Sequence, residues 1–254
     1  MDNRDQVKDF FGRHAAAYTA GRGAPDLERL LALLTPAPGE TALDVATATG
    51  NTALALAPLV AAVVGLDLTP EMGRQFEQRA AAAGIGNARF VAGDATHLPF
   101  PSGSFDLVTC RRAAHHFPDV PGALAEMHRV LRPGGRLGLV DMTVPEAPQA
   151  AALLNAMERD RDPSHLAALS PETWRALVAA AGFAVQTLEV TTEAMPWERW
   201  LAPVTPDAPA GVQAAARARA VPPAQAAPVL RHEPDGTLTV LKQRVVLLAL
   251  RPPE

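Results

Sequence analysis

The sequence predicts an α/β fold in which a mostly parallel β-sheet is covered by helices on both faces. Two observations support this. Between residues 41 and 190, short apolar runs typical of strands alternate with longer stretches of helical pattern. Of the 254 residues, 48% are hydrophobic, which is enough to bury a sizeable core. The length suits one large α/β domain.

The first half of the chain carries most of the predicted sheet. Two helices come first, over residues 5–17 and 25–34, and Pro25 opens the second, where its missing N–H costs nothing. Thr69-Pro70-Glu71 is a further helix start signal. The strands are predicted at 41–46, 61–68, 88–93, 105–110 and 136–142. The helices between them are predicted at 51–59, 69–83 and 119–131.

The second half is expected to add two strands and several helices. Helices are predicted at 146–160 and 171–181, followed by a sixth strand at 183–190. The stretch 203–232 is rich in alanine and proline and is expected to hold a short helix near 207–219. The turn Pro234-Asp235-Gly236 then leads into the last strand, 238–250.

Composition excludes several classes of protein. The formal net charge is −4 and no lysine–arginine run occurs, so a nucleic-acid partner is not expected. A single cysteine, Cys110, excludes an internal disulfide. The most apolar run, Ala53 to Leu66, contains Pro58 and is shorter than the roughly 20 residues of a membrane span. The first residues have no apolar signal core, so a cytoplasmic protein is expected.

The segment LDVATATGNT, residues 43–52, is expected to form a ligand-binding loop. It follows the first strand, and ligands of open parallel sheets bind at the carboxyl ends of strands. Ala46, Ala48 and Gly50 would let the backbone pass close to a ligand, and their i, i+2, i+4 spacing differs from the dinucleotide pattern G-x-G-x-x-G. The two alanines must keep φ negative or be strained. The alternative is an ordinary tight turn between strand and helix.

Two further acids follow the next strands. Asp67 ends the second strand, about 20 residues beyond the loop, where a carboxylate would accept hydrogen bonds from both hydroxyls of a ribose. The alternative is an acid at the start of the following helix. Asp94, in Gly93-Asp94-Ala95 after the third strand, would accept a hydrogen bond from an adenine amino group.

Taken together, these segments resemble class I S-adenosylmethionine (SAM)-dependent methyltransferases, of the UbiE-like or methyltransferase type 11 family. The resemblance is carried by ALDVATATG (42–50), VVGLDLTPEM (63–72), GDATHLPFPSGSFDLV (93–108), AAHHFPD (113–119) and LAEMHRVLRPGGRLGLVD (124–141). The family's loop has the pattern acid-x-G-x-G-x-G, and here alanine replaces the first two glycines. The resemblance implies a Rossmann-like seven-stranded sheet of order 3-2-1-4-5-7-6, with the last strand antiparallel and a helical lid.

The resemblance also implies a role for each cofactor-site residue. Asp44 would orient the loop near the amino group of SAM, and Arg111 would face the methionine moiety. Asp67 would bind the ribose and Asp94 the adenine amine. The remaining candidates would line or cover the cofactor: Tyr18, Ala46, Thr47, Gly50, Leu68 and Ala95. Tyr18 is equally compatible with an ordinary packed helix residue.

The acceptor side is less defined. His115 and His116 follow the fourth strand and are the candidate general bases, because histidine titrates near neutrality. The alternative is a structural role, such as capping the helix near Asp119. Arg159 and Arg161 would bind an anionic acceptor or simply end a solvated helix. Trp174 is expected in the core. No metal-ligand cluster is evident, and methyl transfer requires none.

We therefore expect a methyltransferase acting on a small molecule. A protein that binds SAM without transferring its methyl group, and a nicotinamide-dependent oxidoreductase, are the alternatives. Within a single domain of residues 1–254, we expect an N-terminal helical lid (1–36), a SAM-binding core (37–143), cap elements around the sixth strand (144–232) and the final strand (233–254). The acceptor, the methylated atom and the oligomeric state are not specified by the sequence.

Overall fold

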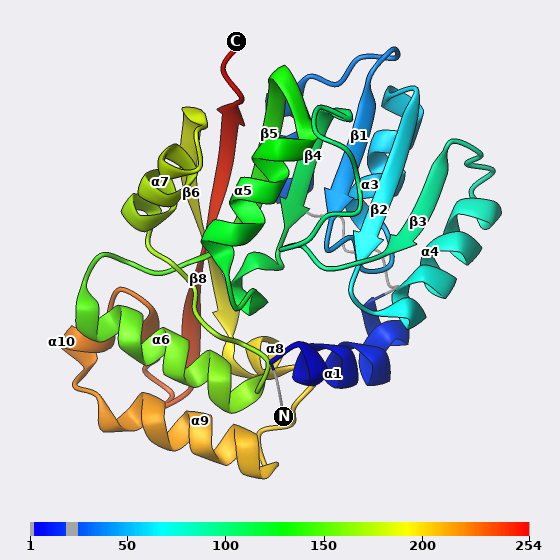
Figure 1. Cartoon of the computed structure of the whole chain (residues 1–254). Coiled ribbons are helices and arrows are strands. Elements are labelled where there is room, and N and C mark those ends of the chain that lie inside the picture. The colour runs from blue at the N-terminus through cyan, green and yellow to red at the C-terminus, as the bar shows by residue number, and fades with distance from the viewer. Residues whose placement is uncertain (1–2, 19–24, 254) are drawn as a thin grey trace.

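The computed structural model describes residues 3–18 and 25–253, and the side chains of residues 9, 10 and 13–18 are outside that description. Its centre is a twisted sheet (Figure 1). The strands are β1 (Thr41–Val45), β2 (Ala62–Asp67), β3 (Ala88–Ala92), β4 (Phe105–Arg111), β5 (Leu131–Thr143), β6 (Ala184–Pro196), β7 (Leu230–His232) and β8 (Leu238–Leu250).

The strand order is β3-β2-β1-β4-β5-β8-β6, and only pairings that involve β8 are antiparallel among the described strands. This confirms the predicted order, with the last predicted strand observed as β8. The predicted count of seven was one too few. Residues 230–232 form the short β7, which pairs with the far end of β8. Three residues at the end of an alanine- and proline-rich stretch carry too little pattern to predict a strand.

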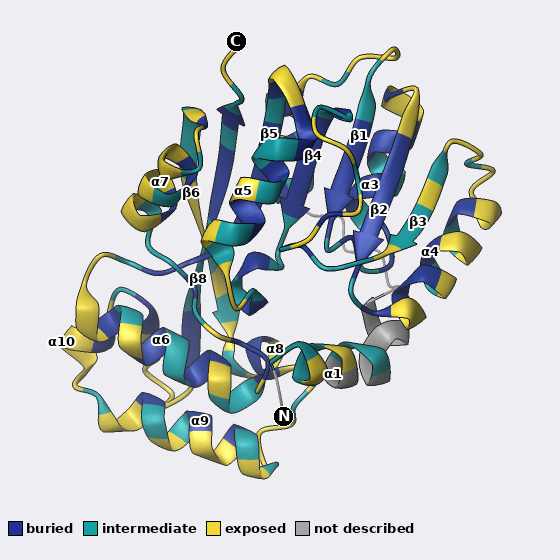
Figure 2. Cartoon of the chain, in the orientation of Figure 1, coloured by how far each residue is buried: buried dark blue, intermediate teal, exposed yellow. Residues whose placement is uncertain are grey.

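Helices cover both faces of the sheet. The α-helices are α1 (Asn3–Tyr18), α2 (Pro25–Leu34), α3 (Asn51–Leu56), α4 (Pro70–Ala82), α5 (Val120–Val130), α6 (Pro148–Arg161), α7 (Pro171–Ala180), α8 (Trp197–Leu201), α9 (Pro209–Ala220) and α10 (Pro223–Ala226). Buried side chains of α5 and α7 pack on one face, and those of α2, α3 and α4 pack on the other. The central strands β1, β2 and β4 are mostly buried, whereas β3 and β6 at the edges are not, and the exposed residues of these helices face outward (Figure 2).

Some elements differ in length from their predictions. The helix after β1 ends at Leu56 and continues as a 3₁₀ turn over Ala57–Leu59, because Pro58 cannot donate a helical hydrogen bond. β5 begins at Leu131 rather than 136. Leu131 pairs with Phe105 and Arg136 with Leu107, so residues 132–135, which include Pro133, form an irregularity in the strand.

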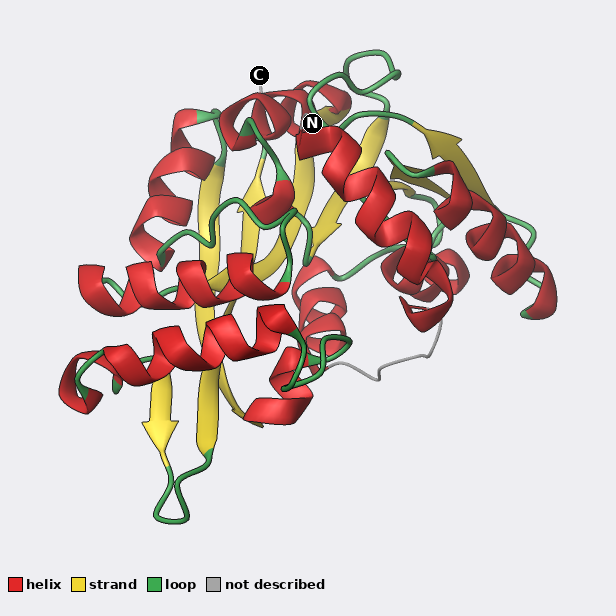
Figure 3. Cartoon of the chain, turned by 90° about the horizontal axis from the view of Figure 1, so that it is seen from below, coloured by secondary structure: helices red, strands yellow, loops and turns green. Residues whose placement is uncertain are grey.

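The lower end of the sheet carries a separate cap. β6 continues to Pro196, beyond the predicted 190, and pairs with β8 along its whole length. α6 and α9 lie side by side beneath this extension (Figure 3). Their apolar residues form a second core with Trp200, Leu230 and Val240. Trp174 lies instead in the main core, as expected.

Among the described helices, none has both the length and the apolar composition needed to cross a membrane.

Candidate functional site

A cavity of about 380 Å³ opens at the carboxyl ends of β1, β2 and β4. Its walls come from the loops after these strands and after β3, from α1, and from the cap. The structure places ten of the twelve predicted site residues on its surface: Asp44, Ala46, Thr47, Asp67, Leu68, Asp94, Ala95, Arg111, His115 and His116. Tyr18 closes α1, but its side chain is outside the described part of the chain. Gly50 precedes α3 and is not one of the residues that line the cavity.

The two alanines of the loop after β1 were expected either to keep a negative φ or to be strained, and they are strained. Ala46 and Ala48 have φ values of 56° and 48°, and Gly50 has a φ of 88°. A left-handed conformation costs an alanine about 1–2 kcal/mol that a glycine does not lose. Gly50 could not be exchanged for alanine, because an added Cβ would lie 2.5 Å from the ring of Phe76.

Asp44 ties this loop to the sheet and to α3. Its carboxylate accepts hydrogen bonds from the hydroxyls of Thr47 (2.6 Å) and Thr109 (2.7 Å) and from the backbone N–H of Ala53 (3.2 Å). Burial raises the pKa of Asp44 to about 6, against hydrogen bonds that favour the ionised form. The loop therefore rests on a buried carboxylate.

Asp67 ends β2 and holds the same loop from the other side. Its two oxygens accept backbone N–H groups of Ala48 (2.8 Å) and Thr69 (2.9 Å). Burial raises the pKa of Asp67 above its usual value, although these hydrogen bonds oppose the change. Asp67 also lines the cavity, so its carboxylate can face a ligand there.

Asp94 joins the loop after β3 to α1. It accepts the backbone N–H and the hydroxyl of Thr96, both at 2.8 Å, and forms an ion pair of 2.7 Å with Arg4. Burial raises the pKa of Asp94, but the bonds from Thr96 and the charge of Arg4 outweigh it and the pKa is lowered. Arg4, which the sequence did not single out, therefore brings α1 onto the cavity rim.

Two arginines follow β4 and share one acid. Arg111 donates from Nε to the hydroxyl of Thr52 (3.1 Å) and approaches Asp26 at 3.4 Å, while Arg112 donates from Nε to Asp26 at 2.7 Å. Burial raises the pKa of Asp26, yet its bond to Arg112 and the two positive charges lower it overall. Asp26 was predicted only as part of a helix, because nothing in its neighbourhood signals a partner 85 residues away.

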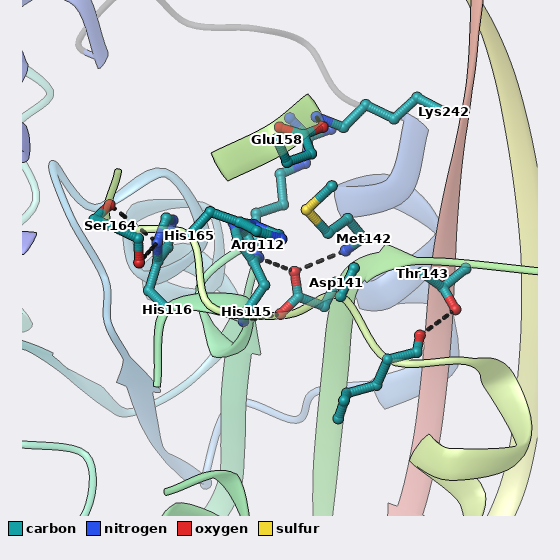
Figure 4. Close-up of polar contacts among 12 residues, drawn as sticks. Arg112, His115, His116, Asp141, Met142, Thr143, Glu158, Ser164, His165 and Lys242 are labelled. Atoms are coloured by element: carbon teal, nitrogen blue, oxygen red, sulfur yellow. Dashed lines mark hydrogen bonds and ion pairs between the residues drawn. The ribbon is translucent and has the colours of Figure 1, made fainter. Parts of the chain in front are cut away.

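His115 pairs with a carboxylate at the end of β5. Its Nδ1 lies 2.5 Å from Oδ1 of Asp141, and its backbone N–H donates to Oδ2 of the same residue at 2.9 Å (Figure 4). Burial raises the pKa of the fully buried Asp141, but the interactions with His115 outweigh burial and lower the pKa. An ionised carboxylate only accepts hydrogen bonds, so Nδ1 of His115 carries a proton.

The rings of His116 and His165 lie beside that of His115, with centroids 4.1 Å and 5.5 Å away from it. Nδ1 of His116 contacts the carbonyl of Ser164 at 3.1 Å, and Nε2 of His165 contacts Oδ1 of Asn155 at 2.8 Å. Burial, followed by the electrostatic interaction with His115, lowers the pKa of His116 to about 4 and that of His165 to about 3. Neither ring caps the helix near Asp119, because Asp119 itself accepts the N–H of Gly122.

The cap side of the cavity carries Arg161 and Lys242. Both contact the buried Glu158, Arg161 at 2.6 Å and Lys242 at 3.5 Å, and Trp200 donates its indole N–H to the same carboxylate at 3.0 Å. Burial raises the pKa of Glu158, but the charges of Lys242 and Arg161 lower it well below its usual value. Arg161 was predicted as a candidate, whereas Lys242 lay unnoticed in the last strand.

Other residues with reactive groups lie apart from this site. Cys110 is buried in β4, where burial raises the pKa of its thiol. No group of three or more His, Cys, Asp or Glu among the described residues is arranged to bind a metal ion.

Comparison with known proteins identifies relatives. A family model described as "Methyltransferase domain" matches residues 43–139. The uncharacterized methyltransferase YcgJ of Bacillus subtilis is 41% identical over 159 residues, which span 63% of each chain. The sequence match thus covers less than two thirds of that relative's length. The crystal structure of YcgJ superimposes with a TM-score of 0.85 at 30% identity, covering 90% of this chain and 99% of that one.

Two further matches differ in what they support. A demethylmenaquinone methyltransferase of Thermus thermophilus is 37% identical over 166 residues, covering 57% of this chain and 74% of the relative. The crystal structure of the [4+2]-cyclase SpnF is 18% identical with a TM-score of 0.69, covering 99% of this chain and 97% of that one. The second match concerns the fold alone, and because SpnF is a [4+2]-cyclase, the fold is not tied to one reaction.

Proposed function

Because the chain belongs to the methyltransferase family, we propose that it transfers a methyl group from SAM to a small-molecule acceptor. The observation that carries this proposal is the cavity itself, where Asp44, Asp67 and Asp94 from three neighbouring strand ends surround one space. Ligands of such sheets bind at this edge. We therefore propose that this cavity is the place where the chain binds SAM.

The residues around the cavity fit the chemistry of SAM. Asp67 lines the cavity with a carboxylate, a group that can accept hydrogen bonds from both ribose hydroxyls. Asp94 would hold the adenine amino group, with Leu68 and Ala95 against the ring. Asp44 and Arg111 would face the charged methionine end, where a carboxylate suits an ammonium and a guanidinium suits a carboxylate. Bound SAM supplies a methyl group made electrophilic by its sulfonium.

His115 would then act as the general base for an acceptor that must lose a proton. Asp141 holds the proton on Nδ1, which leaves Nε2 of His115 as an acceptor, and the residue lines the cavity. A buried carboxylate paired in this way also stabilises the imidazolium that forms. His116 is a poor base, because burial lowers its pKa to about 4. The remaining task of the cavity is to hold the acceptor near 3 Å from the methyl group.

The proposal is tested in two steps. Calorimetric titration with SAM, with its demethylated product S-adenosylhomocysteine (SAH) and with NADH measures which cofactor the chain binds. Methyl-labelled SAM and a panel of phenols, acids and amines then report transfer by mass spectrometry. We expect SAM and SAH to bind, NADH not to bind, and label to appear in an acceptor. Binding of NADH alone would contradict the proposal, and SAM binding without transfer to any acceptor would favour a binding protein.

A further inference from the structure

Arg112 is a cation on the cavity surface, and some of its hydrogen-bond donors have no partner among the described residues. It follows β4 and has a φ of 57°, a conformation that costs a non-glycine residue free energy. Its Nε contacts Asp26, and its side chain is 32% exposed. Its two terminal nitrogens have no hydrogen-bond partner among the described residues. They form the end of the guanidinium fork that recognises carboxylates and phosphates in a bidentate manner.

Lys242 is a second cation of this kind, reaching the cavity from β8. Its side chain is only 16% exposed, and within the described chain Nζ has one acceptor, Glu158, at 3.5 Å. An ammonium has three donors, so most of its hydrogen-bonding capacity is unused. Burial lowers the pKa of Lys242, and Glu158 opposes this change. A buried ammonium with spare donors gains from a further anion.

The two cations belong to one cluster of charged side chains. Arg111 and Arg112 share Asp26, while Arg161 and Lys242 share Glu158. Asp162 also lines the cavity, and its Oδ1 accepts the N–H and the hydroxyl of Ser164. In Figure 4, Arg112 is drawn between His115 and the Glu158–Lys242 pair. The unused donors of Arg112 and Lys242 thus lie in the same cavity as the candidate base.

We propose that Arg112 and Lys242 bind an anionic group of the methyl acceptor, a carboxylate or a phosphate. This inference rests on the proposed function, because it assigns the acceptor end of the same cavity. The anion would complete the hydrogen bonds of both cations and orient the rest of the acceptor toward His115. Arg161 supports the arrangement by neutralising Glu158, with which it forms a bond of 2.6 Å.

The test is calorimetric titration of the full chain saturated with SAH, at constant ionic strength. The probes are inorganic phosphate, benzoate and the neutral analogue benzamide. We expect at least one anion to bind and benzamide not to bind, and the stronger of phosphate and benzoate identifies the chemical source of the charge. Arg112→Leu and Lys242→Met should each weaken anion binding at least tenfold. Arg231→Leu, which removes one exposed charge from β7, is the matched control and should bind like the wild type.

The remaining outcomes distinguish a failure of the proposed function from a failure of the anion site alone. Absence of SAH binding to the wild type would overturn the proposed function and this inference with it. SAH binding without anion binding, equal binding of benzoate and benzamide, or unchanged affinity in both cavity variants would overturn the anion site alone. Arg112→Leu could also weaken SAH binding as much as it weakens anion binding. That result would assign Arg112 to the cofactor and would overturn the proposed anion site. Thermal unfolding of each variant checks that it is folded.

Discussion

The backbone N–H of Ala48 donates a hydrogen bond of 2.8 Å to Oδ2 of Asp67, which joins the loop after β1 to the end of β2. Ala48 reaches this position with a φ of 48°. A strained residue persists where its surroundings determine its conformation, and such residues cluster at functional sites. The bond therefore links the shape of the loop to the carboxylate that we assign to the ribose.

Removing the charge of Asp67 should weaken cofactor binding. Asp67→Asn replaces one acceptor oxygen by an amide, so we expect the affinity for SAH to fall at least fivefold, which is about 1 kcal/mol. Titration calorimetry measures the change, and urea unfolding reports how far the loop contacts contribute to stability. Asp207→Asn, at an exposed loop residue, is the control. Equal SAH affinity in a folded Asp67→Asn variant would contradict the ribose assignment.

Glycine at position 48 should stabilise the protein. Ala48→Gly removes the Cβ that makes the left-handed conformation unfavourable, so the free energy of unfolding should rise by up to about 1 kcal/mol. The same change at Ala179, an exposed residue within α7, should lower it by about 1 kcal/mol. Urea unfolding of both variants measures whether the free energy of unfolding rises or falls in each. A destabilised Ala48→Gly variant would show that the observed φ carries no strain.

Loss of the His115–Asp141 pair should slow the reaction without weakening cofactor binding. His115→Ala removes the proposed base and should lower kcat by about 10²–10⁴-fold. Asp141→Asn keeps the ring but not the carboxylate that fixes its tautomer, so kcat should fall in the same direction. Steady-state kinetics with the acceptor identified above measures both. His232→Ala, at an exposed histidine of β7 that does not line the cavity, should keep the wild-type rate. A His115→Ala variant with a nearly unchanged kcat would exclude this base.

The buried histidines should make stability depend on pH. His165 has a pKa of about 3 when folded, because burial disfavours its charged form, but about 6.5 when unfolded. Unfolding therefore takes up a proton below pH 6.5, and stability present above pH 6.5 is lost as the pH falls toward 3. His116 acts in the same direction down to about pH 4. Asp44, with a pKa of about 6, opposes them between pH 3.8 and 6.

The comparison that isolates one histidine is His165→Gln against the wild type. We expect the slope of unfolding free energy between pH 6 and 4 to decrease by about 1.4 kcal/mol per pH unit in the variant. Urea unfolding at several pH values provides the slope. His232→Gln, at an exposed histidine of β7, should leave the slope unchanged. An unaltered slope in His165→Gln would mean that His165 does not stay neutral in the folded state.

Local patterns in the sequence were sufficient to locate the sheet and most of the cavity. Alternating strands and helices predicted the fold, and the acids at strand ends predicted Asp44, Asp67 and Asp94, which the structure brings to one cavity. Asp141 follows the same rule, since it lies near the carboxyl end of β5, and that signal was present but unused. The strain at Ala46 and Ala48 was one of two open alternatives.

Contacts between distant segments could not be predicted in this way. Lys242 and Glu158 are 84 residues apart, and neither has a local pattern that indicates the other. Lysine within an apolar strand indicates an edge or a surface position, whereas here the extended β6 and the cap bury it. The length of β6 and the short β7 depend on the same packing, so they too became visible only in three dimensions.

The second core, which lies in the cap, affects how the sequence of this protein can change. The wall that carries Asp44 and Asp67 is built on the main cores, whereas Glu158, which pairs with Lys242, lies on α6, whose apolar side belongs to the cap's own cluster. Substitutions in the cap can therefore reshape one half of the cavity while the other half stays intact. Evolution, or a library of variants limited to α6, α8 and the far end of β8, can change this half without rebuilding the half that we propose binds SAM.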